Sequence, residues 1–375
     1  MELKKILILM AKTGGGHNAV AEAVKEVFDK SYKGRVEAQV VDGLRTFAPF
    51  PISHLDSTYP WQIKLDGGLT YGAAWRLLNH KGIAKGFMRS WQPVVESAAK
   101  KIVNQKVDAI VITHPVFVHP CVWAIKKFKK KTKFIVIVPD LKVTHALYGN
   151  PDIDLMLVPS HECFDQAIRH GVSSQKIKLV GLPLRMSFRK KYPAKKDLRK
   201  NLGFDPNKSL VLLMGGGEGL GSFKKTAVYL NKLKDIQTIA FVGKNDNLKN
   251  SLLNENLGPD FHVQGFTDEI AMFMKAADIV VTKAGPTTIC EALVCGLPII
   301  INGFIPNQES KNAKYVEEIG SGKIVEDPEK ITRTVKRWLK DKSLLTKMAK
   351  NALDSSDPKS ALKAAKEIYN FLATK

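Results

Sequence analysis

The chain has 375 residues, 44% of them hydrophobic and 25% charged, which suits a globular protein of about two domains. Lysine and arginine outnumber aspartate and glutamate by 58 to 36, and the net charge of +22 favours a polyanionic partner: an anionic membrane, nucleic acid or a phosphorylated substrate. No run of about 18 apolar residues occurs, which excludes a transmembrane helix. The short apolar start predicts a first strand rather than a signal peptide, so we expect a cytoplasmic protein.

The first half of the chain alternates between predicted strands and helices. Residues 18–28 place small and β-branched apolar residues on one helix face. The expected strands are residues 4–10, 36–41, 107–113, 134–138 and 154–158. This alternation predicts a parallel α/β sheet with right-handed crossovers.

Residues 46–100 interrupt the alternation and are too long for an ordinary connection. The segment is rich in aromatic residues, including Trp61, Trp75, Phe87 and Trp91, among Pro, Gly, Lys and Arg. Two interpretations remain open. The segment is either an extra helical subdomain with its own core or a membrane-docking element with aromatics at the lipid interface.

The pattern restarts after a basic stretch that follows Gly181-Leu182-Pro183. Further strands are expected at residues 209–214, 238–242, 261–264, 278–282 and 297–301. We therefore expect two α/β domains, one over residues 1–188 and one over 189–351. A terminal helix over 352–375 is expected to pack back on the first domain.

A glycine-rich turn, Thr13-Gly14-Gly15-Gly16-His17, joins the first strand to the first helix. Glycines let a ligand approach the backbone closely, and a helix N-terminus attracts anions. The same dipole disfavours a protonated His17, so a neutral imidazole could serve as a general base. A histidine that only caps the turn is the alternative.

Two similar turns occur in the second half. Gly215-Gly216-Gly217-Glu218 follows the strand at 209–214, and Lys283-Ala284-Gly285-Pro286-Thr287-Thr288 follows the strand at 278–282. Both place a possible helix N-terminus where a phosphate could bind, with a ligand-free turn as the alternative. Glu291, about one turn into the next helix, could accept both hydroxyls of a ribose or could simply be solvated.

Polar side chains follow the strand at 297–301. Gln308 and Glu309 could bind vicinal hydroxyls of a hexose at this sheet edge, where ligands of parallel sheets usually lie, or form a plain polar loop. In the first half, Asp42, Asp140 and His145 follow strands in the same way and could orient His17 or an acceptor hydroxyl, or cap local structure.

Cys121, Cys163, Cys290 and Cys295 form no CxxC pair, so we expect reduced thiols and no metal site.

With these motifs in place, the chain resembles the monogalactosyldiacylglycerol synthases and bacterial processive diacylglycerol glucosyltransferases over nearly its whole length. The most specific segments are LILMAKTGGGHNAVAEAV, LPLRMSF, LVLLMGGGEGLG and TKAGPTTICEALVCGLPIIINGFIPNQESKNAKYVEE. The resemblance implies a GT-B fold, in which two Rossmann-like parallel-sheet domains face a cleft. It also implies an inverting hexosyltransferase with a UDP-hexose (UDP-galactose or UDP-glucose) donor, a diacylglycerol acceptor in an anionic membrane, no cofactor and no obligatory catalytic metal.

The resemblance implies that residues 1–188 bind the acceptor and the membrane and that residues 189–351 bind the UDP-sugar. It also implies roles for individual residues. His17 would be the base, with Asp140 beside it, and the acceptor or membrane would meet Trp61, Trp75, Phe87, Trp91 and His145. The residues expected to bind UDP-sugar are Gly16, Gly215, Gly216, Gly217, Glu218, Gly243, Phe266, Thr267, Lys283, Ala284, Gly285, Pro286, Thr287, Thr288, Glu291, Gln308, Glu309 and Asn312.

Three other functions remain open at this point. One is transfer of N-acetylglucosamine to a polyprenyl-linked precursor, and a second is UDP-sugar epimerisation, which needs no membrane. The third, nucleic-acid binding, is prompted by charge alone, because no interleaved basic and aromatic module is present. We expect a peripheral protein at the inner face of the membrane.

Overall fold

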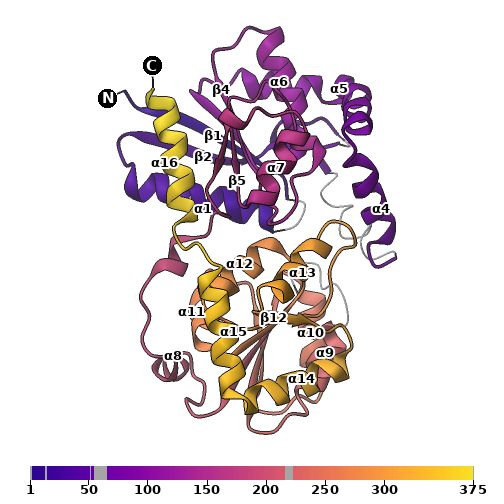
Figure 1. The fold of residues 1–375 in the computed structure, drawn as a ribbon, viewed down its shortest axis with the longest axis vertical. Coiled ribbons are helices and arrows are strands. Elements are labelled where there is room, and N and C mark those ends of the chain that lie inside the picture. Colours follow the sequence, from indigo (N-terminus) through magenta and orange to yellow (C-terminus); the bar gives the residue numbers. More distant parts are fainter. Residues whose placement is uncertain (1, 13–14, 51, 55–65, 216–222, 375) are drawn as a thin grey trace. The chain divides into compact units, whose positions relative to one another are not determined.

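The computed structural model describes residues 2–12, 15–50, 52–54, 66–215 and 223–374 (Figure 1). Contacts divide the chain into two compact units. Unit 1 comprises residues 1–65, 69–186 and 358–375, and unit 2 comprises 66–68 and 187–357. The division after residue 186 lies close to the boundary expected at 188, and the C-terminal segment belongs to unit 1.

Within its described residues, unit 1 is built on a six-stranded parallel sheet of order β2-β1-β3-β4-β5-β6. The strands are β1 Lys4–Met10, β2 Val36–Asp42, β3 Ala109–Ile112, β4 Lys133–Ile137, β5 Leu155–Val158 and β6 Ile177–Leu179. The central strands β3 and β5 are buried along their whole length, as expected for apolar runs covered on both faces. The short edge strand β6 was missed from the sequence.

Helices cover this sheet on both faces (Figure 1). They are α1 Gly16–Ser31, α2 Gly43–Phe47, α4 Leu69–Leu78, α5 Lys81–Val103, α6 Val118–Lys127, α7 His161–Arg169 and α16 Ser360–Ala373, with 3₁₀ turns η1 Ile52–His54, η2 Pro115–Phe117, η3 Ala146–Tyr148 and η4 Ser174–Lys176. The terminal helix α16 packs on α1, where the rings of Tyr32 and Tyr369 lie 4.8 Å apart. The terminal helix begins at Ser360, later than the start expected at 352, because α15 continues to Asp354.

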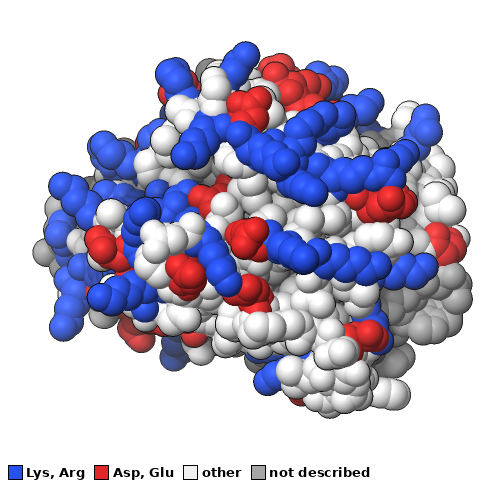
Figure 2. Space-filling view, turned by 90° about the horizontal axis from the view of Figure 1, so that it is seen from below, with Lys and Arg blue, Asp and Glu red and all other residues white. Residues whose placement is uncertain are grey.

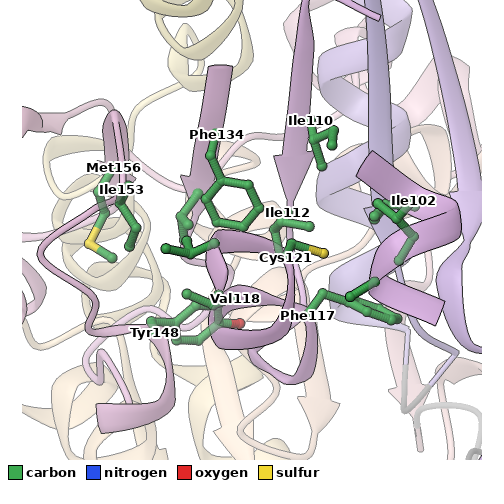
Figure 3. Packing of buried hydrophobic residues seen from close by; sticks show 14 of the residues in the cluster. Ile102, Ile110, Ile112, Phe117, Val118, Cys121, Phe134, Tyr148, Ile153 and Met156 are labelled. Atoms are coloured by element: carbon green, nitrogen blue, oxygen red, sulfur yellow. The ribbon is translucent and has the colours of Figure 1, made fainter. Parts of the chain in front are cut away.

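The main core of unit 1 lies between α5, α6 and the sheet (Figure 3). Side chains from β3, β4 and the two helices meet there, and the fully buried ring of Tyr148 joins them from η3. The segment at 46–100 therefore has two parts. The second half of α5 belongs to this core, whereas its first half forms a small cluster with η3 through Ala84, Met88, Ala146 and Leu147.

Unit 2 repeats the architecture, with a six-stranded parallel sheet of order β12-β11-β10-β7-β8-β9 in its described part. The strands are β7 Ser209–Met214, β8 Ile236–Gly243, β9 Phe261–Gly265, β10 Ile279–Thr282, β11 Ile299–Ile301 and β12 Gly322–Ile324. The helices are α8 Lys195–Asn201, α9 Phe223–Leu230, α10 Asp246–Leu253, α11 Ile270–Ala276, α12 Pro286–Val294, α13 Ser310–Glu318, α14 Pro328–Lys340 and α15 Lys342–Asp354, and the turn η5 Met186–Arg189 precedes them. Trp338 of α14 is the largest fully buried side chain of its core.

The positive charge is widely distributed over the surface. Figure 2 shows Lys and Arg side chains spread across one face, with Asp and Glu side chains among them. In the ranges that the structure describes, no helix combines the length and apolar character needed to cross a membrane.

Candidate active site

Each sheet has one position where the strand order reverses. In unit 1 the chain passes from β1 outward to β2 and then returns to the other side of β1 with β3; in unit 2, β10 returns beside β7 in the same way. Ligands of open parallel sheets bind beyond the carboxyl ends of strands at such switch points. The two glycine-rich turns and the Lys283–Thr288 turn follow three of these four strands.

His17 lies at the switch point of unit 1, in the first turn of α1, directly after Gly16. Its Nδ1 lies 2.7 Å from the carbonyl oxygen of Thr113, the residue after β3. Because a carbonyl can only accept, Nδ1 must carry the hydrogen and Nε2 must hold the free lone pair. Burial lowers the pKa of His17 to about 4, and the bond to Thr113 offsets part of that shift. The imidazole is therefore neutral at pH 7, as a general base requires.

The residues around this imidazole are themselves tightly held. The hydroxyl of fully buried Thr113 lies 3.3 Å from Leu9 O and 3.2 Å from His17 O, so its single hydrogen can be donated to either carbonyl and link the end of β3 to β1 or to α1. The ring of His114 lies 4.5 Å from that of His17, and its Nδ1 accepts from the backbone N–H of Val116. Burial and the neighbouring His17 hold the pKa of His114 well below its usual value.

The three other polar residues at this sheet edge have structural contacts. Asp42 caps α2, since its Oδ1 accepts from the N–H groups of Leu44 and Arg45. His145 is fully buried; its Nε2 donates to Trp75 O and its Nδ1 accepts from Leu147 N, so in this structure it holds α4 against η3. Asp140 is buried beyond β4, close enough to Tyr148 to help raise the pKa of that phenol.

At the switch point of unit 2, helix α12 begins with Pro286 after an N-cap glycine, Gly285, that offers no side-chain cap. The N–H groups of Thr287 and Thr288 are thus the first donors of the helix, and such groups attract an anion. Ala284 is tied to β11 through its N–H, which donates to Gly303 O, and Asn312 Nδ2 donates to Ala284 O. The turn is therefore held in place, and its N-cap residue contributes no side-chain cap to the start of α12.

Glu309 performs a structural task that the sequence did not predict. It is 4% exposed; its Oε1 pairs with Lys283 Nζ at 2.7 Å and its Oε2 accepts from Ile305 N at 3.0 Å. Both carboxylate oxygens are thereby used to connect the two turns. In this structure Glu309 connects the two turns, and Gln308 has a buried amide oxygen without a partner among the described residues.

Four buried polar atoms that follow β10 and β11 in the chain have no hydrogen-bond partner among the described residues. They are Thr287 Oγ1, Asn302 Nδ2, Gln308 Oε1 and Asn312 Oδ1, and they come from the α12 end, the β11 end and the α13 turn. Native proteins rarely leave buried polar groups unpaired, so these atoms indicate a polar ligand. Glu291, predicted to bind ribose, is 9% exposed and lies on α12.

The other residues predicted to bind the UDP-sugar have different structural surroundings. Gly215 is needed for packing, since a Cβ there would lie 2.5 Å from the Phe223 ring. Gly243 has φ +60° at an irregularity where β8 pairs with β9. Phe266 is 54% exposed just after β9, and Thr267 Oγ1 accepts from Glu269 N. Gly216, Gly217 and Glu218 lie outside the described residues.

The aromatic residues predicted to meet the acceptor or the membrane in residues 46–100 differ in burial. Trp75 is partly buried against His145, with ring centroids 4.0 Å apart, and partly buried Trp91 packs on the core. Phe87 is 38% exposed and stacks on Trp91. Trp61 lies outside the described residues. The apolar residues that face solvent on α4 and α5 are instead mainly aliphatic: Leu69, Leu77, Ile83 and Val94.

Sequence reasoning missed Thr113, His114, Tyr148 and Asn302. The polar pair Thr113-His114 at a strand end was a usable signal, but only the observed order β1-β3 places it beside His17.

Comparison with solved structures identifies the class of protein. The chain is similar to MurG of Acinetobacter baumannii (TM-score 0.60, 17% identity, 98% of this chain and 99% of that chain). It is also similar to MnaA of S. aureus in a co-structure with UDP (TM-score 0.65, 14% identity, 99% and 98%). At these identities the likeness concerns the fold, which is GT-B.

Sequence comparison then gives the family. The family model for monogalactosyldiacylglycerol (MGDG) synthase matches residues 17–184, and the glycosyltransferase family 28 C-terminal domain matches residues 210–368. Monogalactosyldiacylglycerol synthase 3 of Arabidopsis thaliana is 33% identical over 98% of this chain and 82% of its own length, and the Spinacia oleracea synthase is 33% identical over 99% and 73%. The chain belongs to the monogalactosyldiacylglycerol synthase family.

Proposed function

We propose that this protein transfers galactose from UDP-galactose to diacylglycerol, with inversion at the anomeric carbon, to give a monogalactosyldiacylglycerol. The curated relatives, at about a third identity over nearly the whole chain, carry the name of this product. The observation that carries the chemistry is His17, whose Nδ1–H is fixed by Thr113 O and whose Nε2 is left as a base.

The residues of unit 1 handle the acceptor. Nε2 of His17 removes the proton of the diacylglycerol hydroxyl as its oxygen attacks the anomeric carbon from the face opposite the nucleotide. The carbon–oxygen bond to UDP breaks, and UDP leaves with the bonding electron pair. A neutral imidazole is ready for this step because burial holds its pKa at about 4.

The residues of unit 2 handle the donor. The open N-terminus of α12, with the N–H groups of Thr287 and Thr288, stabilises charge that grows on the leaving diphosphate. Glu291 binds the ribose and Gln308 the hexose. On this basis no catalytic metal or cofactor is required, and EDTA should leave the rate within about twofold, because fixed helix donors replace the cation.

The acceptor is a membrane lipid, and α4 and α5 provide a surface suited to a membrane. Exposed Leu77, Ile83 and Phe87 lie among the exposed basic residues Arg76, Lys81, Lys85 and Arg89. Apolar side chains that enter the interface beside cations that meet anionic headgroups are typical of peripheral proteins. The protein would bind peripherally at the cytoplasmic face of an anionic membrane.

The test is incubation with anionic vesicles that contain diacylglycerol and with radiolabelled UDP-galactose or UDP-glucose, followed by mass and anomeric analysis of the lipid. A β-galactosyl lipid from the α-linked donor is expected. A glucosyl lipid would correct the donor. Products from UDP-sugar alone, or transfer only to a polyprenyl-linked acceptor with UDP-N-acetylglucosamine, would overturn the proposal.

A further inference from the structure

The carbonyl oxygen of Thr113 accepts two hydrogen bonds. His17 Nδ1 lies 2.7 Å away, and the hydroxyl of Tyr148 donates to the same oxygen at 2.9 Å. A carbonyl oxygen has two lone pairs, so both donors can be satisfied at once. The imidazole and the phenol are thus joined through a single backbone atom.

The hydroxyl of Tyr148 is not needed to fill space. The ring is fully buried and lies beside Val118 in the core of unit 1 (Figure 3). A phenylalanine would fill the same volume without the cost of burying a hydroxyl, which is offset only by a hydrogen bond. Burial raises the pKa of Tyr148 well above its usual value, so the group remains a donor throughout the physiological pH range.

The peptide of Thr113 is held on its other sides by β1 and α1. Its N–H donates to Leu9 O at 3.0 Å, and its hydroxyl, which has one hydrogen, lies within hydrogen-bond distance of both Leu9 O and His17 O. The carbonyl is the part that these bonds leave free to tilt, and Tyr148 restrains it. The direction of the Thr113 carbonyl sets the plane of the imidazole, because the Nδ1–H group of His17 points at a lone pair of that oxygen.

We propose that Tyr148 is a positioning residue for the catalytic base: its hydroxyl fixes Thr113 O, which in turn fixes the tautomer and the plane of His17. This inference rests on the proposed role of His17 in transfer. Tyr148 itself is carried by η3, which α4 and α5 hold in place, for example through Asn79 Oδ1, which accepts from Ala146 N at 2.8 Å.

The arrangement also affects proton affinity. Two donors share the electron density of one carbonyl, so each bond is weaker than it would be alone. Loss of the Tyr148 hydroxyl should strengthen the bond that the imidazolium donates to Thr113 O and move the pKa of His17 upward. The titratable groups that face this pair are His114 beside His17, and Asp140, Cys163 and Tyr71 around Tyr148.

The test compares Tyr148→Phe with the wild type in the vesicle assay. We expect kcat to fall about tenfold and KM for UDP-galactose to stay within about twofold. A misoriented base weakens stabilisation of the transition state but does not change binding of the donor. The acid limb of kcat and the NMR titration of His17 should both move to higher pH. Tyr32→Phe, which removes a hydroxyl elsewhere in unit 1, is the matched control and should change neither.

A second substitution reverses the expected direction. 3-Fluorotyrosine at position 148 keeps the ring shape and donates more strongly, so the titration of His17 should move to lower pH. Movement in opposite directions supports the proposal. A fall in kcat of Tyr148→Phe with the wild-type His17 titration would mean a purely structural role and would overturn it, as would unchanged kcat and titration in a folded variant. The His17 titration needs no substrate, so it judges this proposal even if galactosyl transfer fails.

Discussion

Both units are built on a six-stranded parallel sheet, but they differ in strand order and in the polar contacts at their switch points. In unit 1 His17 and Tyr148 share Thr113 O at the end of β3, although Asp42 Oδ2 and His119 Nε2 lack a partner among the described residues. In unit 2 Thr287 Oγ1 and Gln308 Oε1 have no partner in the part of the chain that the structure describes. A base must be held in one orientation, whereas a site for a polar ligand must keep its donors and acceptors available. The difference suits unit 1 to holding a catalytic base and unit 2 to binding a polar ligand.

The largest effect should follow from removal of the base. His17→Ala should lower kcat by about 10²–10⁴-fold, the usual contribution of a general base. The galactose transfer assay with saturating UDP-galactose measures it, and His161→Ala, exposed on α7 of the same unit, is the control. Unchanged turnover in His17→Ala would show that unit 1 does not supply the base.

The next effect should separate sugar binding from nucleotide binding in unit 2. Gln308→Ala removes a buried acceptor from the ligand, so kcat/KM for UDP-galactose should fall about 10–100-fold, equivalent to about 1–3 kcal/mol. Affinity for UDP alone should not change. Gln264→Ala, exposed on β9, serves as the control, and an equal loss of UDP affinity in Gln308→Ala would reject its assignment to the sugar.

Loss of Glu309 should lower the free energy of unfolding, because its carboxylate connects two turns of unit 2. Glu309→Ala leaves half-buried Lys283 without its partner and should lower the free energy of unfolding by about 2–3 kcal/mol, less than for a fully buried pair. Urea denaturation provides the measurement. Asp354→Ala, which breaks an exposed pair with Lys350, should cost less than about 1 kcal/mol. Equal costs would show that burial of the Glu309 pair is unimportant.

A smaller effect is expected at the proposed membrane surface. Phe87→Ser should weaken binding to anionic vesicles by roughly tenfold, because about 1–2 kcal/mol of apolar burial is lost. Sedimentation with vesicles tests this, and Leu253→Ser, exposed on α10 of unit 2, is the control. If only the control variant lost binding, the docking surface would lie on unit 2.

The last effect concerns the pH dependence of stability. Burial lowers the pKa of His145 to about 4, below its unfolded value, so between that pH and about 6.5 the unfolded chain binds more protons. Stability should therefore be full above pH 6.5 and should decrease as pH falls toward 4. Urea midpoints across this range measure the slope, and His145→Asn should flatten it. An identical slope in both proteins would exclude His145 as a source.

The sequence predicted both sheets because long apolar runs bounded by glycine turns are visible in it. Strands β6 and β12 were missed because each has three residues, at least one of them exposed, at a sheet edge. The orientation of Trp75 and Trp91 could not be predicted either, since aromatic residues on amphipathic helices suit a core and a lipid interface equally well.

At the site, His17 and Gln308 were visible as polar residues after strands. The structural use of Glu309 was not, because it depends on Lys283, which lies on a different turn. Tyr148 reads as an ordinary core aromatic, and only the contact of its hydroxyl with Thr113 O reveals another role. Contacts between segments that lie far apart in the chain could therefore not be predicted from the sequence.

Calorimetric titration of UDP into His17→Ala and Glu291→Ala most directly tests whether unit 1 supplies the base and unit 2 binds the nucleotide. The affinity of His17→Ala for UDP should stay within about twofold of the wild type, and Glu291→Ala should bind about tenfold or more weakly, as expected when the partner of a ribose hydroxyl is lost. Loss of UDP binding in His17→Ala, together with wild-type affinity in Glu291→Ala, would contradict the account.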